Sequence, residues 1–420
     1  MSEQVTEREI READKLVDAA HRAGGLAPLA LDAFWAEEER AEKDPFSADC
    51  PRAGLGIRMA DECIFTELDV PVDWYRMEHD EAYRLPLARA YNDKAERIVG
   101  RRLLREEPPS GPDRRWPRLK ELWEIFEGRN VWDDAARSYW LYPAARTEGE
   151  LAALLDRVEK RLADLRGFLL PPGWEEEKKR LQALGEPLPL YRHQRGPVTF
   201  ATSIYGPENL IFLIMDNPDL AARYRDLILK AILGRARIVD EEAGYTPETA
   251  PHGWSWADDN CALLNREMYE FFGWPVLKGV FDRYCPDAGD PRYQHSDSAM
   301  GHLLPLLGRL GFTGVNFGPN VMVRDIRRHM PRAVIHGQLA PFVFSRNEEV
   351  NMVAEAIRDC GMAREGRGLL FTTAGSINNG SRLTGMRLLM AAIQEYGRYG
   401  TPSTRRFPPS PAASSRRPSA

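Results

Sequence analysis

From about residue 187 to residue 400, short apolar or β-branched runs alternate with longer segments of helical periodicity. The runs are 187–193, 252–259, 292–297, 313–319, 333–338 and 368–376, and the longer segments include 207–244, 265–284, 299–311, 348–361 and 383–400. A strand, a short loop and a helix repeated at this spacing build parallel βαβ units. The number of units favours an eight-stranded (β/α) barrel of the TIM type over an open sheet. No GxGxxG motif follows any run, which weakens a dinucleotide-binding fold.

The N-terminal part of the chain predicts an addition to this α/β barrel. Residues 1–24 have the pattern of a charged amphipathic helix, and the apolar run 25–35 predicts a short strand that ends near Asp32. We expect the barrel to span 25–400, with a helical insertion around 60–186. Within that insertion, Thr147 followed three residues later by Glu150 predicts a capped helix over 147–165. The segment 196–206 predicts a loop with some β character, and the Pro/Ser/Arg-rich tail 401–420 predicts disorder.

Composition and charge narrow the class of protein. The chain is 43% hydrophobic and 29% charged, which is typical of a globular protein with a large core. A net charge of −6 argues against general affinity for nucleic acid or acidic membranes. The charged N-terminus lacks an apolar signal core, and no long apolar run follows, so we expect a cytoplasmic protein without membrane spans. The five cysteines form no CxxC pair, which fits a reducing compartment and thiols buried in the core.

Polar residues gather where the predicted strands end. In a barrel of this type, the C-terminal ends of the strands carry the chemistry. The candidates at these ends are Asp32, His193, Asp259, His295, Asp297, Asn316, His336, Gln338 and Ser376. In the segment "GPVTFATSIYG", Thr199 and Tyr205 add hydroxyl groups that suit a substrate carboxylate. In "ADDN", two consecutive carboxylates, Asp258 and Asp259, alternate in direction along a strand, so one faces the mouth and the other caps the helix near 265 or holds a neighbouring Arg or Lys; a helix-capping role for both is the alternative.

The stretch "RYQHSDS" gives the most specific indication of a functional site. His295 and Asp297 are two residues apart on a strand, so their side chains point the same way. Three interpretations stay open. The pair binds a divalent metal that Asp259 or His336 completes; or Asp297 orients His295 as a proton donor; or Asp297 caps the next helix and His295 fills a polar corner. Nearby aromatic residues, Trp254, Trp256 and Phe317, either stack on a flat ligand or pack in the core.

Several motifs, taken in order, resemble the uroporphyrinogen decarboxylase superfamily, which includes zinc-dependent methyltransferases that work with corrinoid proteins, coenzyme M or tetrahydrofolate. The motifs are "GPVTFATSIYG", "HSDSAMGHLLPLLGRLGFTGVNFGP", "AVIHGQLAP" and "GLLFTTAGSINNGSRLTGMRLLMAAIQEYGRY", and "YNDKAERIVGRRLLRE" resembles the N-terminal portion of uncharacterised bacterial members. The resemblance implies a (β/α) barrel with an N-terminal helical addition, and a homodimer.

The chain departs from both branches of that superfamily at identifiable positions. Decarboxylases that act on the tetrapyrrole carry an arginine-rich stretch near the first strand, where this chain reads "LALDAFWAEEER". The methyltransferases carry a His-x-Cys pair and a later Cys. His295 matches the histidine, but Asp297 stands at the first cysteine position and Ser376 falls near the second. Without thiolates, zinc would have only nitrogen and oxygen ligands here, and such a hard ligand set suits an oxygen or folate-type acceptor better than a thiol.

The resemblance therefore implies a methyltransferase acting on a small molecule with a corrinoid-binding protein or a folate-type acceptor. Its catalytic residues are His295, Asp297 and Asp259, with zinc on His295 and Asp297, while Asn316 and His336 position the acceptor. The alternative is a decarboxylase of a small acid or tetrapyrrole-like substrate. There, Asp32 or Asp259 stabilises a developing cation and His295 or His336 delivers a proton. A barrel that binds a ligand without turnover is the third interpretation.

Overall fold

One parallel sheet forms the centre of the molecule in the computed structural model, which describes residues 5–107, 118–133, 138–185, 188, 192 and 194–400. Seven strands pair in the order β1-β9-β8-β7-β6-β5-β4, and every neighbouring pair is parallel. The strands are β1 (Gly54–Leu55), β4 (Gln194–Arg195), β5 (Trp254–Ala257), β6 (Arg292–Ser296), β7 (Gly314–Phe317), β8 (Val334–Leu339) and β9 (Leu369–Thr373). The predicted α/β barrel class is confirmed, with seven parallel strands in the described part of the chain; the first of them, β1, lies at Gly54–Leu55, where no strand was predicted, and not at 25–35.

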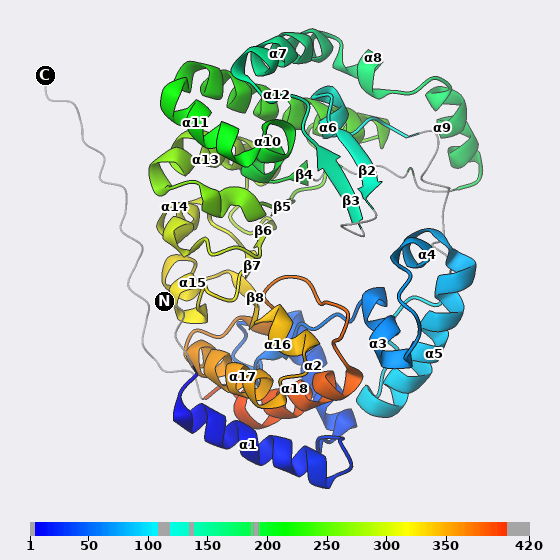
Figure 1. The fold of residues 1–420 in the computed structure, drawn as a ribbon, viewed down its shortest axis with the longest axis vertical. Coiled ribbons are helices and arrows are strands. Elements are labelled where there is room, and N and C mark those ends of the chain that lie inside the picture. The colour runs from blue at the N-terminus through cyan, green and yellow to red at the C-terminus, as the bar shows by residue number, and fades with distance from the viewer. Residues whose placement is uncertain are drawn as a thin grey trace, which may run out of the picture.

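Helices follow the strands and cover the outer face of the sheet (Figure 1). They are α10 (Pro197–Tyr205), α11 (Pro207–Asp216), α12 (Pro218–Glu242), α13 (Arg266–Tyr284), α14 (Leu304–Leu307), α15 (Val323–His329), α16 (Pro341–Ser345), α17 (Glu349–Ala363) and α18 (Leu383–Tyr396), with 3₁₀ turns at Asp61–Cys63, Asp259–Leu263, Gly301–Leu303 and Gly308–Leu310. Long apolar side chains from strands and helices form the core between them. All five cysteines are buried free thiols, as predicted, and four of them (Cys63, Cys261, Cys285 and Cys360) belong to this core.

The register of the sheet sets up the mouth of the barrel. In β6, Gln294 and Ser296 are fully buried towards the helices, while Tyr293 and His295 keep some exposure. This alternation places Tyr293 and His295 on the inner face. Ala257 of β5 pairs with His295, and His295 pairs with Asn316 of β7, so the ends of three strands lie side by side.

The N-terminal addition is built from helices and one hairpin. The helices are α1 (Glu7–Arg22), α2 (Leu31–Lys43), α3 (Ile64–Leu68), α4 (Trp74–His79), α5 (Glu81–Val99), α6 (Leu122–Ile125), α7 (Glu148–Ala163), α8 (Leu165–Leu169) and α9 (Trp174–Ala183), and the hairpin pairs β2 (Arg129–Asp133) with β3 (Ser138–Tyr142). A capping box of Thr6 and Glu9 starts α1, which packs on α17 and α18. Thr147 caps α7 as predicted, since its hydroxyl accepts the Glu150 N–H.

The structure corrects four local predictions. The run 25–35 ends in helix α2 rather than in a strand, because Asp32 and the Glu/Ala/Arg-rich residues after it favour a helix and short apolar runs fit either structure. The segment 196–206 is helix α10, begun by Pro197 at its first position. The segment 299–311 is split into short turns around Pro305 and Gly308. The insertion contains the β2–β3 hairpin, which no sequence pattern indicated.

Two predictions fall largely or wholly outside the part of the chain that the structure describes. The strand expected at 187–193 is described only at Leu188 and Arg192, and the observed strand β4 follows it at Gln194–Arg195. The tail 401–420 lies outside the described residues. Among the described helices, none alone is long and apolar enough to cross a membrane, and α10 and α11 meet that criterion only as a pair bent by 102°.

Candidate functional site

Asn316 holds His295 in one tautomer at the end of β6. The Asn316 side chain donates through Nδ2 to the carbonyl oxygens of His336 (2.6 Å) and Thr373 (3.0 Å). A flipped amide would set its oxygen against those two oxygens, so Oδ1 is the atom that faces His295. His295 Nδ1 lies 2.7 Å from Asn316 Oδ1 and therefore donates its proton there. This leaves the lone pair of the neutral ring on Nε2.

Asp259 and Asp297 face that free nitrogen. Asp259 Oδ1 lies 3.6 Å from His295 Nε2 and accepts the backbone N–H of Asp297 at 3.2 Å. One ligand atom from each of the three residues lies within 4.8 Å of the other two. Burial, and next the Asp297 carboxylate, raise the pKa of Asp259, while His295 opposes the shift. The cluster thus brings two mutually repelling carboxylates and one imidazole lone pair to one point, where a cation would stabilise all three.

Asp258 turns the other way and caps a helix. Its Oδ1 accepts the Thr199 N–H at 2.8 Å, at the third residue of α10. A Cβ on Gly196 would lie 2.1 Å from Asp258 Cβ, so glycine is required for this close approach. Burial raises the pKa of Asp258 to about 6. One carboxylate of the pair faces the mouth, as expected, but the other caps α10; Asn265 caps α13 instead.

A pocket of about 490 Å³ opens beside the cluster. The barrel strands contribute one side of it, through Ser255, Trp256, Ala257, Tyr293 and His295. Burial raises the pKa of Tyr293 to about 12, so its phenol is neutral. Strand β4 and helix α10 add Gln194, Arg195 and Phe200.

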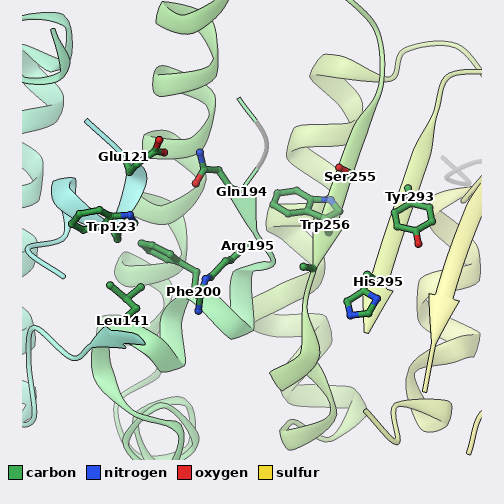
Figure 2. Close-up of a pocket in the computed structure, with 11 residues that line it drawn as sticks. Glu121, Trp123, Leu141, Gln194, Arg195, Phe200, Ser255, Trp256, Tyr293 and His295 are labelled. Atoms are coloured by element: carbon green, nitrogen blue, oxygen red, sulfur yellow. The ribbon is translucent and has the colours of Figure 1, made fainter. Parts of the chain in front are cut away.

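The N-terminal addition closes the opposite side of the pocket with Glu121, Trp123 and Leu141. Figure 2 shows Trp123 and Leu141 on one side, His295 and Tyr293 on the other, and Arg195 between them. Glu121 is paired with the buried Arg235 at 2.7 Å, so its charge is balanced within the wall. One side of the pocket thus carries Trp123 and Leu141, and the other carries His295, the member of the triad of Asp259, His295 and Asp297 that lines it.

The other predicted site residues differ in their relation to the pocket and the triad. His336 packs edge-to-face on Tyr293 with ring centroids 5.7 Å apart, and burial, with a smaller effect of Arg58, lowers its pKa. The Thr199 hydroxyl accepts the Asn260 N–H at 3.0 Å. Gln338 is fully buried and donates to the carbonyl oxygens of Gly318 and Val321. Thr199, Gln338 and the buried Tyr205 do not line the described pocket.

Asp32 and Ser376 do not line the described pocket, and His193 lies outside the described residues. Asp32 is exposed in the first turn of α2, so the strand end that suggested its role does not exist. Ser376 is exposed and follows the end of β9 at Thr373.

Sequence reasoning missed Arg195, Tyr293, Glu121, Trp123 and Leu141. For Arg195 a signal was present: the following Gly-Pro pair is typical of a helix start, which places the strand end at Arg195. Tyr293 is two residues before His295 and so shares its face. Nothing local indicated the three residues of the N-terminal addition, because their position depends on long-range packing.

The donor set of the triad fits a divalent cation. One imidazole and two carboxylates are ligands that zinc accepts, and spacings below 4.8 Å close readily around a metal with bonds of about 2.0–2.2 Å. The nearest cysteine in sequence, Cys261, is buried with its Sγ 3.5 Å from Ser296 Oγ, and burial raises its pKa, so it stays a thiol. Asn316 adds the outer hydrogen bond that metal-binding histidines typically make.

One of three comparisons with known proteins shows the family of this chain. The family model described as Uroporphyrinogen decarboxylase (URO-D) matches residues 177–396, more than half of the chain. Among solved structures, a methyltransferase from Methanosarcina mazei aligns with a TM-score of 0.45 and 16% sequence identity, covering 78% of this chain and 96% of that one. A search of the curated proteins gives no significant match.

Proposed function

Because the chain belongs to the uroporphyrinogen decarboxylase family, we propose that it is a barrel enzyme that transfers a methyl group between a small molecule and a corrinoid protein or folate-type partner. The cluster of Asp259, His295 and Asp297 beside the pocket carries this proposal. Its nitrogen and carboxylate donors favour a divalent cation, zinc in the first place, over a purely protein-based site. A homodimer in the cytoplasm belongs to the same proposal.

Each residue of the site has a separate role in this proposal. His295 offers Nε2, and Asp259 and Asp297 offer carboxylate oxygens, to hold the cation. Asn316 keeps the lone pair of His295 in place. When bound, the cation supplies Lewis acidity to the heteroatom that carries the methyl group. In methyl removal, the bond from that heteroatom to carbon breaks, its electron pair stays on the heteroatom, and the partner's nucleophile takes the methyl group. Carboxylate ligands keep the cation a hard Lewis acid, which suits polarisation of the bond between the methyl carbon and an oxygen or nitrogen leaving group.

Methylcobalamin formation tests the proposal. The full-length chain with zinc is incubated with cob(I)alamin and, in turn, 5-methyltetrahydrofolate and a panel of small O-methyl and N-methyl acids, and the absorbance change is followed. We expect transfer from at least one donor, a loss of at least about 100-fold in His295→Ala, and no change in His252→Ala. His252 belongs to a second His/Asp cluster, with Asp287 and Asp290, and is a matched control. Transfer that His295→Ala leaves intact contradicts the proposal.

A decarboxylase of a small acid is the second candidate, and the contact between His295 Nε2 and Asp259 Oδ1 favours it. In its charged form, His295 donates to Asn316 and faces Asp259, so it can deliver a proton to carbon. The bond from the carboxyl group to carbon breaks, CO2 leaves, and the electron pair on carbon takes that proton. CO2 release that persists after chelation of metal, without methylcobalamin formation, would select this alternative.

A further inference from the structure

Arg195 presents a positive charge to the pocket. In the described residues, its guanidinium makes one hydrogen bond, from Nη1 to Ser203 Oγ at 3.4 Å, and no carboxylate lies within 4.0 Å of it. Nearby protein atoms lower the pKa of Arg195, with Asp259 opposing the shift, but the residue as a whole is exposed and keeps its charge. A guanidinium that is open to a ligand and makes a single long hydrogen bond has donors left to pair with an anion.

The other charges near the pocket are already balanced or belong to the triad. Glu121 is paired with Arg235, which is 2% exposed. The Asp259 and Asp297 carboxylates cluster with His295, and Figure 2 shows His295 on the opposite side of the pocket from Trp123 and Leu141. Arg195 is therefore the charge that the pocket offers to a ligand once the triad holds a cation.

The walls around Arg195 select the shape of the ligand. Phe200 and Trp256 line the pocket on the barrel side, and Trp123 and Leu141 line it on the side of the N-terminal addition. Phe200 and Trp256 are each 2% exposed, so packing fixes their positions at the wall, while Trp123 is half-buried and offers more of its ring surface. Rigid aromatic walls favour flat unsaturated bodies. A volume of about 490 Å³ holds one or two fused rings with a small substituent.

We propose that this pocket binds a small planar monocarboxylic acid, with the carboxylate on the Arg195 guanidinium and the ring between Phe200, Trp256 and Trp123. The inference rests on the proposed function, since such an acid would be the small molecule that gains or loses the methyl group. An Arg fork pairs with a carboxylate through two parallel hydrogen bonds, which sets the orientation of the ring relative to the triad. The part of the acid remote from Arg195 then lies towards His295.

Calorimetric titration of the full-length chain tests this inference with 2-naphthoate and with 2-naphthamide, its uncharged counterpart. We expect the acid to bind at least about 10-fold more tightly than the amide. In Arg195→Gln the two affinities become equal while the amide binds as before, and Arg195→Lys keeps part of the preference. Arg309→Gln is the matched control: Arg309 is a half-exposed arginine paired with Glu270 outside the pocket. It removes the same charge and should change neither affinity.

Repeating the titration with His295→Ala separates this inference from the proposed function. If the acid is still preferred and methyl transfer is lost, both hold. If the preference survives but no methyl transfer is ever found with the parent, the ligand class holds and the proposed reaction fails. Equal affinities in the parent, a preference that survives in Arg195→Gln, or one that disappears in His295→Ala would each overturn the assignment to Arg195.

Discussion

Replacing Asn316 with alanine should weaken both the fold and the metal site, by amounts that the structure lets us estimate. The 6% exposed side chain makes three hydrogen bonds, to His295, His336 and Thr373. At about 1 kcal/mol each, with an added cost for buried groups left unpaired, their loss should lower the free energy of unfolding by about 2–4 kcal/mol. Without its acceptor, the His295 ring is no longer held in one tautomer, and metal affinity should fall about 10- to 100-fold.

Two assays read these effects separately. Urea unfolding followed by circular dichroism gives the stability, and competition with a chromogenic chelator gives the zinc affinity. Asn92→Ala is the control, because Asn92 is equally buried in α5 and makes four hydrogen bonds, to Leu103, Leu104 and Glu106. It should lose comparable stability at unchanged zinc affinity. Equal zinc affinities in the parent and in Asn316→Ala would refute the argument that Asn316 orients a metal ligand.

Three further predictions follow from the geometry around the site. The raised pKa of Asp258, about 6 against an ordinary 3.8, makes its contribution to stability fully present below about 3.8 and lost as the pH rises through 6. The parent should therefore gain on the order of 2 kcal/mol over Asp258→Asn between pH 7 and pH 4 in urea unfolding, and parallel pH profiles would contradict this. All five thiols are buried and burial raises their pKa values, that of Cys63 to about 12, so Ellman's reagent should label none quickly in the native protein and five in denaturant; one fast native thiol would be the opposing result. A Cβ on Gly318 would lie 2.6 Å from the backbone carbonyl oxygen of Ser298 and 2.7 Å from that of Asp297. Gly318→Ala should therefore displace Asp297 and weaken zinc binding, which the same chelator competition measures. Unchanged zinc affinity would contradict this prediction.

The sequence predicted the centre of the site because its residues obey short-range rules. Side chains two residues apart on a strand share a face, which placed His295 with Asp297. Parallel strands end at the same edge of the sheet, which brought Asp259 and Asn316 beside them. The alternation of strands and helices beyond residue 252 is regular enough that each later strand was found within about two residues.

The rest of the site depended on information that no local pattern holds. Helix α10 is rich in β-branched residues, and besides Pro197 at its first position its start relies on a cap from Asp258, some sixty residues further along the chain. Arg195 is the exception: β4 has only two residues and shows no periodicity, but the Gly-Pro pair after it is a local signal that the prediction did not use. Trp123 and Leu141 reach the pocket only because the N-terminal addition packs against the barrel. Asp32 illustrates the converse error, an apolar run assigned to a strand that folds as a helix.

Metal content tests the central claim most directly. Tag-free parent protein, the double variant His295→Ala/Asp297→Ala and the control His252→Ala are prepared identically and analysed for zinc by elemental analysis. The proposed site predicts about one zinc per chain in the parent and in His252→Ala, and almost none in the double variant. Equal metal in all three proteins, or loss of zinc only in His252→Ala, would contradict a metal site at Asp259, His295 and Asp297.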